Sequence, residues 1–200
     1  MDSGPQTGMP CDDNEALDAR LMQWLAEMAT GNEHALSDFY DATLGKVYGV
    51  AIRIIGDSTL AEDVVTDVYH DAWNNASNYS RERGRPLAWL LTICRNRALD
   101  RYRHESSAAR TIEAAAAQQV SDAVDEPDAL LASVEEGHAV HALLATISTE
   151  DRQLIALAFF KGLTHQQIAD VTAMPLGTVK SRIRRALNAL SEAVPTDLRI

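Results

Sequence analysis

The sequence predicts an all-α protein with two small helical domains joined by a flexible linker. Apolar residues recur at three- and four-residue spacing through residues 15–105 and again through 130–193, the pattern of amphipathic helices. No segment shows the apolar–polar alternation of a strand. Between these parts, residues 106–129 are rich in Ala, Ser, Gln and acid, and we interpret them as the linker. Residues 1–14 and 194–200 are predicted to be tails, the first of them disordered.

The first domain is predicted to contain four helices whose ends are marked in the sequence. Glycine stops the first two helices, an aspartate–serine pair can cap the third, and a proline opens the fourth. These markers are Gly31, Gly56, Asp57 with Ser58, and Pro86. The second helix is expected to bend near Gly45. Residues 74–85, between the third and fourth helices, are polar and are interpreted as a loop.

The third and fourth helices each separate apolar from charged residues. The predicted buried side of the third helix is Leu60, Val64, Val68 and Trp73, and its remaining surface is dominated by Glu62, Asp63, Asp67 and Asp71. The predicted inward residues of the fourth helix are Leu87, Leu90, Leu91, Cys94, Ala98 and Tyr102. The acidic side of the third helix has an ordinary explanation as a solvated surface, which composition alone favours.

The second domain is predicted to be a small bundle built around a nearly apolar helix. A helix over residues 130–147 comes first. The next helix starts at Thr149–Asp151 and is apolar on nearly all sides through Leu154–Phe160, so we expect it at the centre of the bundle. Gly162 ends this helix.

A helix-turn-helix motif follows. Thr164 and Gln167 have the spacing of a capping box, which predicts the start of a short helix. Pro175 prevents that helix from continuing, because proline lacks an N–H and restricts the residue before it. A second helix is predicted from about residue 176 to 190.

The second helix of the motif has the character of a DNA-recognition helix. Its predicted packing stripe is Val179, Ile183, Ala186, Leu187 and Leu190, opposed across the turn by Ile168, Ala169 and Val171. Off the stripe lie Lys180, Ser181, Arg184 and Arg185, with Thr178 beside them. Arginine and lysine provide both phosphate contacts and bidentate guanine contacts in the major groove. The alternative is an ordinary amphipathic helix with a solvated basic side.

The distribution of charge supports two nucleic-acid contacts. The formal net charge is −11, which argues against a nonspecific polyanion binder. Residues 81–103 nevertheless contain seven arginines against Glu82 and Asp100, and the recognition helix adds a second basic cluster that includes Arg182. Two basic patches on an acidic chain leave electronegative surface for other partners.

Other classes of protein find little support in the sequence. Cys11 and Cys94 indicate neither a disulfide framework nor a zinc site, although a regulatory disulfide between them stays open. Glu135, His138 and His141 have helical spacing, but no further strong ligand or nucleophile accompanies them. We therefore expect no metal, no cofactor and no enzymatic activity. With no basic–apolar signal peptide and no apolar run of membrane-spanning length, we expect a cytoplasmic protein without membrane insertion.

The chain resembles the bacterial extracytoplasmic-function (ECF) sigma factors, the smallest group of RNA polymerase specificity subunits. Residues 39–57 (FYDATLGKVYGVAIRIIGD) and 60–79 (LAEDVVTDVYHDAWNNASNY) are similar to sigma regions 2.1–2.2, and residues 86–103 (PLAWLLTICRNRALDRYR) to region 2.4. Residues 151–187 resemble region 4, with the specific patterns L-T-x-x-x-I-A and G-T-V-K-S-R-I-x-R-A. Regions 1.1 and 3 have no counterpart in this sequence. The resemblance thus implies two domains, region 2-like and region 4-like.

The resemblance implies three sets of contacts with RNA polymerase and promoter DNA. The β′ clamp coiled coil of the polymerase would bind Glu62, Asp63, Val64, Asp67 and Val68. The −10 element would be melted and captured by Arg83, Arg85, Trp89, Arg95, Asn96, Arg97, Arg101 and Arg103, with Asn96 at the pocket for an extruded base. The −35 element would be recognised by Thr178, Lys180, Ser181, Arg182, Arg184 and Arg185. Thr66 stands where the family often has glutamine, so the polymerase contact is expected to differ there.

The resemblance also implies the remaining partners. These are the β flap of core RNA polymerase and an anti-sigma factor that masks one or both domains. A conventional helix-turn-helix regulator remains the alternative. It would need a ligand-binding or phosphoacceptor domain, and the sequence shows no β–α alternation that would supply one.

Overall fold

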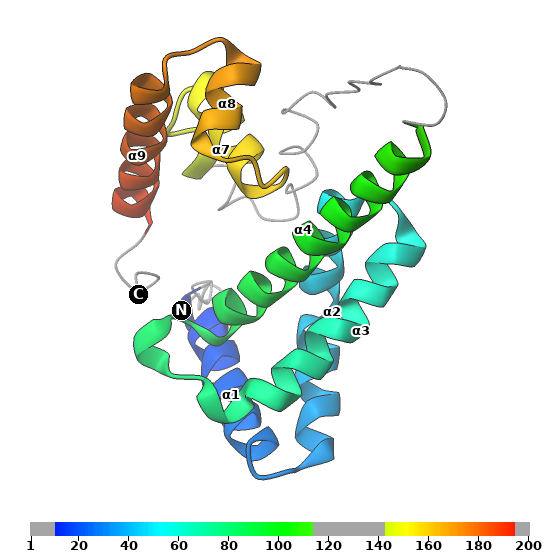
Figure 1. Ribbon diagram of the computed structural model, residues 1–200. Helices are drawn as coiled ribbons and strands as arrows, with labels where there is room; N and C mark the ends of the chain where they lie inside the picture. The colour runs from blue at the N-terminus through cyan, green and yellow to red at the C-terminus, as the bar shows by residue number, and fades with distance from the viewer. Residues whose placement is uncertain (1–10, 114–142, 195–200) are drawn as a thin grey trace, which may run out of the picture. The chain divides into compact units, whose positions relative to one another are not determined.

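The structure is a computed structural model that describes residues 11–113 and 143–194. Over these ranges it contains helices and connecting turns with no strand, which confirms the all-α prediction (Figure 1). The α-helices are α1 (Cys11–Met28), α2 (Glu33–Ile55), α3 (Ser58–Asn75), α4 (Pro86–Glu113), α7 (Thr149–Phe159), α8 (His165–Thr172) and α9 (Leu176–Ala193). Two short 3-10 helices, η1 (Ala76–Asn78) and η2 (Arg81–Arg83), lie between α3 and α4.

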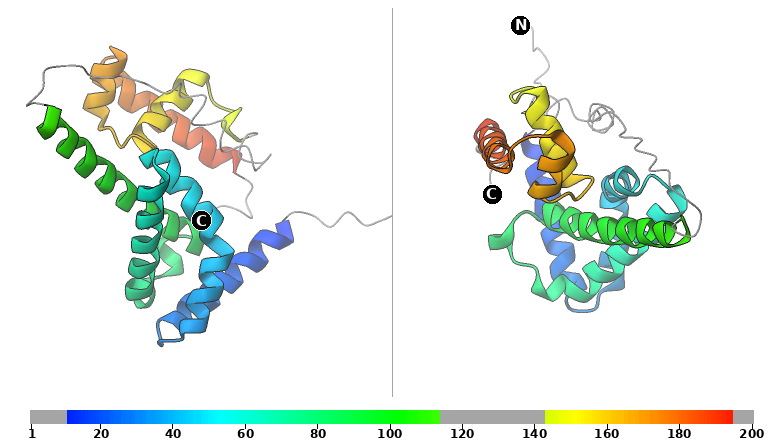
Figure 2. Two further views of the ribbon diagram at one scale, coloured as in Figure 1. Left: turned by 90° about the vertical axis from the view of Figure 1, so that its right-hand side faces the viewer. Right: turned by 45° about the horizontal axis from the view of Figure 1, so that its top comes forward.

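The chain divides into two compact units. The first contains the residues up to Ala98 except 53–55, and the second contains those three residues together with the chain from Leu99 onward. Figures 1 and 2 show α1–α4 from blue to green and α7–α9 from yellow to red. The boundary between the units falls within α4, after Ala98; α1 and α3 lie in the first unit, and α7–α9 lie in the second.

Two helix boundaries differ from the prediction. Helix α1 begins at Cys11, ahead of the predicted start at Glu15, and α4 continues to Glu113, into the predicted linker. Residues 106–113 contain Ala108 and Ala109 and neither glycine nor proline, so nothing in their chemistry stops the helix. The rest of the predicted linker lies outside the described residues, as does most of the helix predicted over 130–147.

The first unit has an apolar core to which all four of its helices contribute. Its buried side chains include Leu21 and Leu25 from α1, Phe39 and Val47 from α2, Val64 and Val68 from α3, and Leu90 and Cys94 from α4. One polar side chain, Thr43, is buried among them. Its hydroxyl donates to the Phe39 carbonyl at 2.6 Å and shares a 2.8 Å hydrogen bond with the Tyr69 hydroxyl, so the Thr43 hydroxyl is satisfied.

Cys94 is part of this core. Its side chain is fully buried, and its Sγ lies 3.3 Å from the Val47 carbonyl oxygen. Burial raises the pKa of the Cys94 thiol to about 12, so the reactive thiolate is scarce at neutral pH. A disulfide between Cys94 and Cys11 would require the core to open.

The second unit is built on contacts among α7, α8 and α9. Its core consists of Leu154 from α7, Ile168 and Ala169 from α8, and Val179 and Ile183 from α9. Leu154 and Ala156 are buried, but Phe159 of the same helix is exposed, so α7 is less enclosed than its apolar sequence predicted. Ser148 caps α7 by accepting a hydrogen bond from the Asp151 N–H at 3.1 Å.

Three residues predicted to face inward are exposed. Val171 on α8 is 64% exposed, Leu187 on α9 is 51% exposed, and Tyr102 on α4 is also exposed. Helix α8 has only eight residues, and Ile168 and Ala169 supply its buried side. The apolar stripes are wider than the surfaces that neighbouring helices cover, so residues at their margins reach solvent.

The predicted helix-turn-helix is present. The Thr164 side chain accepts from the Gln167 N–H, and the Gln167 side chain accepts from the Thr164 N–H at 2.9 Å, so the predicted capping box is confirmed. Ala173 ends α8 in the left-handed conformation, with φ 53° and ψ 27°, and Pro175 immediately precedes α9.

Replacing Ala173 with glycine is expected to stabilise the second unit. Alanine at a left-handed position costs about 1–2 kcal/mol, and glycine removes this cost but loses more backbone entropy on folding. We expect a net gain of about 0.5–1 kcal/mol in the free energy of unfolding, measured by urea denaturation. Ala189→Gly, inside α9, is the control and should destabilise by about 1 kcal/mol. If both substitutions destabilise the protein, the left-handed conformation of Ala173 is not a source of strain.

Candidate nucleic-acid interface

Helix α9, the predicted recognition helix, presents a cationic face to solvent. Thr178, Lys180, Ser181, Arg184 and Arg185 are all exposed, whereas Val179 and Ile183 from the same turns are buried. Four of the exposed residues line an open depression of about 520 Å³, together with Gly177 and Asn188. The Ser181 hydroxyl donates to the Thr178 carbonyl at 3.0 Å. One side of α9 thus packs on the unit, and the other offers cations and hydroxyls.

Arg182 does not share this environment. Its guanidinium forms ion pairs with Asp151 and Glu150 of α7, each at 2.6 Å, and its side chain is only 19% exposed. Arg182 was grouped with the −35 contacts in the sequence because of its charge and position on α9. The structure instead places it at the junction of α7 and α9, where it links the two helices.

The carboxylate of Asp151 is adapted to this pairing. Burial alone would raise its pKa, but hydrogen bonds from the Arg182 guanidinium and from Ser148 outweigh burial and hold the pKa of Asp151 below its ordinary value. Hydrogen bonds to Glu150 and Asp151 likewise raise the pKa of Arg182. The pair is therefore fully ionised at neutral pH.

Several arginines of the predicted −10 surface are paired with carboxylates. Arg85 forms an ion pair with Asp18 of α1, and the Arg97 guanidinium donates to Asp71 of α3 at 2.8 Å. The pairs within α4 itself are Arg101 with Glu105 at 3.1 Å and Arg103 with Asp100 at 3.4 Å. The positive charge of this surface is thus partly balanced in the protein without DNA.

The other predicted −10 residues differ in exposure. Asn96 is exposed on α4, whereas Arg95 and Trp89 are half-buried. Arg83 belongs to η2, and its side chain lies outside the described residues.

Tyr79, in the loop before α4, is not among the individual −10 residues predicted from the sequence. Its ring meets the ring of Trp89 edge-to-face, with 5.5 Å between centroids, and its hydroxyl donates to the Gly84 carbonyl at 3.0 Å. Burial is the main cause that raises the pKa of Tyr79, so its hydroxyl stays protonated. An aromatic residue inside an otherwise polar loop was the available signal, since such a ring commonly packs against the surface beneath it.

The predicted polymerase-contact residues of α3 lie partly on the surface and partly in the core. Glu62, Asp63 and Asp67 are exposed, but Val64 is 2% exposed and Val68 is 0% exposed. The two valines belong to the core of the first unit and cannot contact another protein directly. They hold α3 in place, while the acids present its outer side.

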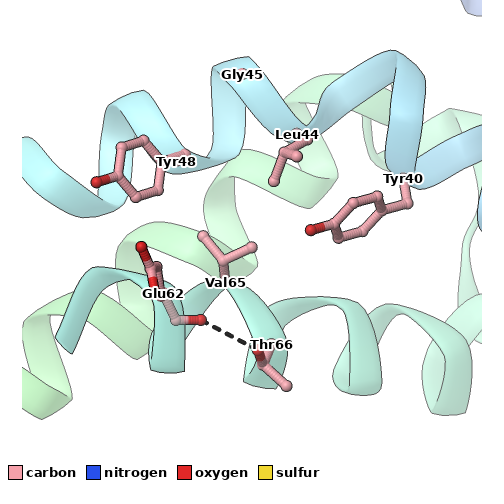
Figure 3. Close-up of a pocket in the computed structure, with 7 residues that line it drawn as sticks. All are labelled: Tyr40, Leu44, Gly45, Tyr48, Glu62, Val65 and Thr66. Carbon is pink, nitrogen blue, oxygen red and sulfur yellow. Dashed lines mark hydrogen bonds between the residues drawn. The ribbon is translucent and has the colours of Figure 1, made fainter. Parts of the chain in front are cut away.

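A groove lies beside this acidic surface, between α2 and α3. It has a volume of about 540 Å³ and is lined by Tyr40, Leu44, Gly45, Tyr48, Glu62, Val65 and Thr66 (Figure 3). The Thr66 hydroxyl donates to the Glu62 carbonyl at 3.1 Å, so Thr66 adds a methyl group rather than a free donor to the groove. An apolar groove with an acidic border suits a partner that offers apolar and basic side chains.

The described residues show neither a metal site nor a membrane span. No group of three His, Cys, Asp or Glu in this part of the chain could hold a metal ion, and the three residues considered as ligands from sequence lie outside it. None of the described helices is long and apolar enough to cross a bilayer.

Comparison with known proteins identifies the class to which these features belong. Residues 39–108 match the family Sigma-70 region 2, and residues 137–190 match Sigma-70, region 4. A protein named ECF RNA polymerase sigma factor SigK, from Mycobacterium ulcerans, is 36% identical over 167 residues, which cover 83% of this chain and 89% of the relative. A protein of the same name from Mycolicibacterium vanbaalenii is 35% identical over 178 residues, covering 88% and 90%.

Both comparisons agree on the family. The two regional matches define a sigma-70 protein with regions 2 and 4. The chain belongs to the ECF RNA polymerase sigma factors. A solved structure of SigE from Rhodobacter sphaeroides in complex with the anti-sigma ChrR is also similar, with 29% identity, coverage of 86% of this chain and 96% of that chain, and a TM-score of 0.44.

Proposed function

We propose that the protein is a sigma subunit that binds core RNA polymerase and directs it to promoters through −10 and −35 elements. The observation that carries the proposal is the exposed cationic face of α9 on a capped helix-turn-helix, in a chain of the ECF sigma family. As a specificity subunit it would act without catalytic chemistry of its own. Lys180, Ser181, Arg184 and Arg185 are the proposed −35 contacts, and Arg182 supports their helix.

The first unit is proposed to capture the melted −10 element. The arginines of the loop and α4 supply cations that bind phosphates. Trp89 and Asn96 supply flat side chains that can contact unstacked bases. Of the arginines already paired with acids, the exposed Arg97 and Arg103 would exchange a carboxylate for a phosphate when DNA arrives. Such an exchange makes binding by this unit weak in the absence of core polymerase and sensitive to salt.

The proposed core-binding surface consists of the outer acids of α3 and the neighbouring groove. Glu62, Asp63 and Asp67 supply negative charge, and Tyr40 and Tyr48 supply apolar area with a polar tip. This combination fits a basic helix of the polymerase, and the β′ clamp coiled coil is the proposed partner. From family membership alone, we further propose the β flap as a partner of the second unit and an anti-sigma factor as regulator.

Run-off transcription tests the function directly. Core RNA polymerase is incubated with a library of genomic fragments, including the DNA upstream of this gene, with and without the protein. Defined transcripts that require both protein and core would establish a sigma factor. DNA binding by the protein alone, without any polymerase-dependent transcript, would instead favour a conventional helix-turn-helix regulator.

Filling the groove is expected to block core binding without unfolding the first unit. A Cβ added at Gly45 meets nothing within 4 Å, and removing glycine from a helix interior favours the helix, so Gly45→Trp should fold. The new indole would occupy space that the partner needs, and we expect affinity for core to fall by about tenfold or more. The measurement is competition for core polymerase between variant and wild-type protein.

Gly45→Ala is the matched control for this variant. It replaces the same glycine but adds only a methyl group, which meets nothing within 4 Å. It should bind core as the wild type does. Equal affinities for the two variants would contradict the groove as part of the polymerase interface.

A further inference from the structure

The segment between α3 and α4 is fastened to helix α1 by side-chain contacts. The Arg85 guanidinium, at the end of the segment, pairs with Asp18 of α1, and both side chains are mostly buried. Nearer the middle of the segment, Arg81 Nη1 lies 3.7 Å from the Met22 sulfur of the same helix. Helix α1 also contacts η1. Residues 76–85, which we term the connecting segment, therefore lie against α1 along much of their length.

The contacts within the connecting segment converge on the same end. The Tyr79 hydroxyl donates a hydrogen bond to the Gly84 carbonyl, and the Tyr79 ring packs against Trp89 of α4. Gly84 has φ 125° and ψ 173°, a conformation available essentially only to glycine, and it sits directly before Arg85. The direction in which the segment enters α4 is thus fixed by a backbone that only glycine adopts and by the pairing of the next residue with α1.

We propose that Asp18 is a positioning residue for recognition of the −10 element. It acts through Arg85 and orients the connecting segment and the adjacent Trp89. The mostly buried carboxylate of Asp18 lies on α1. This helix precedes residues 39–108, the part of the chain that matches Sigma-70 region 2. The charge of Asp18 holds the Arg85 guanidinium against α1, so the role of Arg85 is to anchor the segment rather than to contact DNA first.

This inference rests on the proposed promoter recognition and makes it more specific. A loosened connecting segment would still let the protein bind core and the −35 element. It would admit a wider range of bases at the −10 element, because the side chains that discriminate between them would no longer be held in one arrangement. Loss of discrimination confined to −10 positions is therefore the signature of a positioning role.

The test is run-off transcription with the full-length protein and core polymerase from a promoter that the wild type uses. The yield from the native promoter is divided by the yield from single-base −10 variants, and separately by the yield from single-base −35 variants. For Asp18→Asn we expect the −10 ratio to fall by about five- to tenfold, because the neutral amide can still accept a hydrogen bond but no longer forms an ion pair with the Arg85 guanidinium. The −35 ratio should stay within about twofold of wild type.

Three outcomes separate this inference from its alternatives. Asp18→Glu keeps the charge and should recover most of the −10 ratio, and Gln23→Ala, which removes only a hydrogen bond to Glu27 within α1, should leave both ratios unchanged. If Asp18→Asn lowers total yield but changes neither ratio, or both ratios equally, Asp18 is merely structural and the proposal is wrong. If the wild type itself directs no transcription, the proposed sigma function fails first.

Discussion

Replacing Arg182 with alanine is expected to destabilise the second unit by about 1–3 kcal/mol, although its side chain is not part of the apolar core. Arg182 is 19% exposed and pairs with two carboxylates, of which Asp151 is 15% exposed and Glu150 is 65% exposed. An exposed pair contributes about 0–1 kcal/mol, so Glu150 adds little. Removing the partner of the mostly buried Asp151 leaves a carboxylate unpaired, which costs about 1–3 kcal/mol.

Urea denaturation followed by circular dichroism measures this effect, and Arg184→Ala is the matched control. Arg184 lies two residues away on α9 but is exposed on the cationic face. We expect it to change the free energy of unfolding by less than about 0.5 kcal/mol. Equal destabilisation by the two substitutions would show that Arg182 contributes no more than any arginine of this helix.

The free energy of unfolding of wild type and Arg182→Ala is expected to differ in its dependence on pH. The pKa of Asp151 is lowered in the folded protein from an ordinary value of 3.8, so its pairing stabilises the folded state most above that value. The stabilisation is lost as pH falls below 3.8 through the folded-state pKa. The difference in the free energy of unfolding between wild type and Arg182→Ala should accordingly be constant near neutral pH and become smaller in acid.

The helix-turn-helix could be predicted from sequence because its signals are local. Thr164 and Gln167 are three residues apart, and the hydrogen bonds that they form involve no other part of the chain. Pro175 acts through its own ring. The alternation of buried and exposed residues on α9 follows from the helix repeat, which is why Lys180, Arg184 and Arg185 were placed correctly on the exposed side.

The role of Arg182 could not be predicted in this way. Its carboxylate partner Asp151 is 31 residues earlier in the chain, and only the packing of α7 against α9 brings them together. In sequence, Arg182 is one cation among several. The same reasoning applies to Arg85 and Asp18, which are 67 residues apart. Long-range ion pairs are fixed by tertiary structure, so no local pattern in the sequence indicates them.

Val64 and Val68 show a different limit. Carrying over a family's binding motif residue by residue combined two apolar residues with the acids around them. The helix repeat separates these residues: the valines face the core, at 2% and 0% exposure, and the acids face solvent. The periodicity of α3 already predicted a buried valine side, and in this case it was the better guide to surface residues than the motif.

Reversing the charge of both Arg184 and Arg185 is expected to abolish −35-dependent transcription. Each arginine directed at bases or phosphates contributes about 1–3 kcal/mol to DNA binding, and glutamate adds repulsion from the phosphates. For Arg184→Glu combined with Arg185→Glu we expect a loss of about 4 kcal/mol, or roughly a thousandfold in affinity. Both residues are exposed on α9, so the second unit should keep its fold and the protein should still bind core polymerase.

Salt dependence and a control variant distinguish this loss from a general effect of charge. Binding of the reconstituted holoenzyme to a −35 duplex is measured over a range of salt, and the logarithmic slope should fall by about 0.9 for each phosphate contact removed. The control is Arg20→Glu, a single reversal at an exposed residue of α1, compared with Arg184→Glu and Arg185→Glu singly. If Arg20→Glu weakens the −35 complex as much as either single reversal on α9, net charge rather than the recognition helix governs binding.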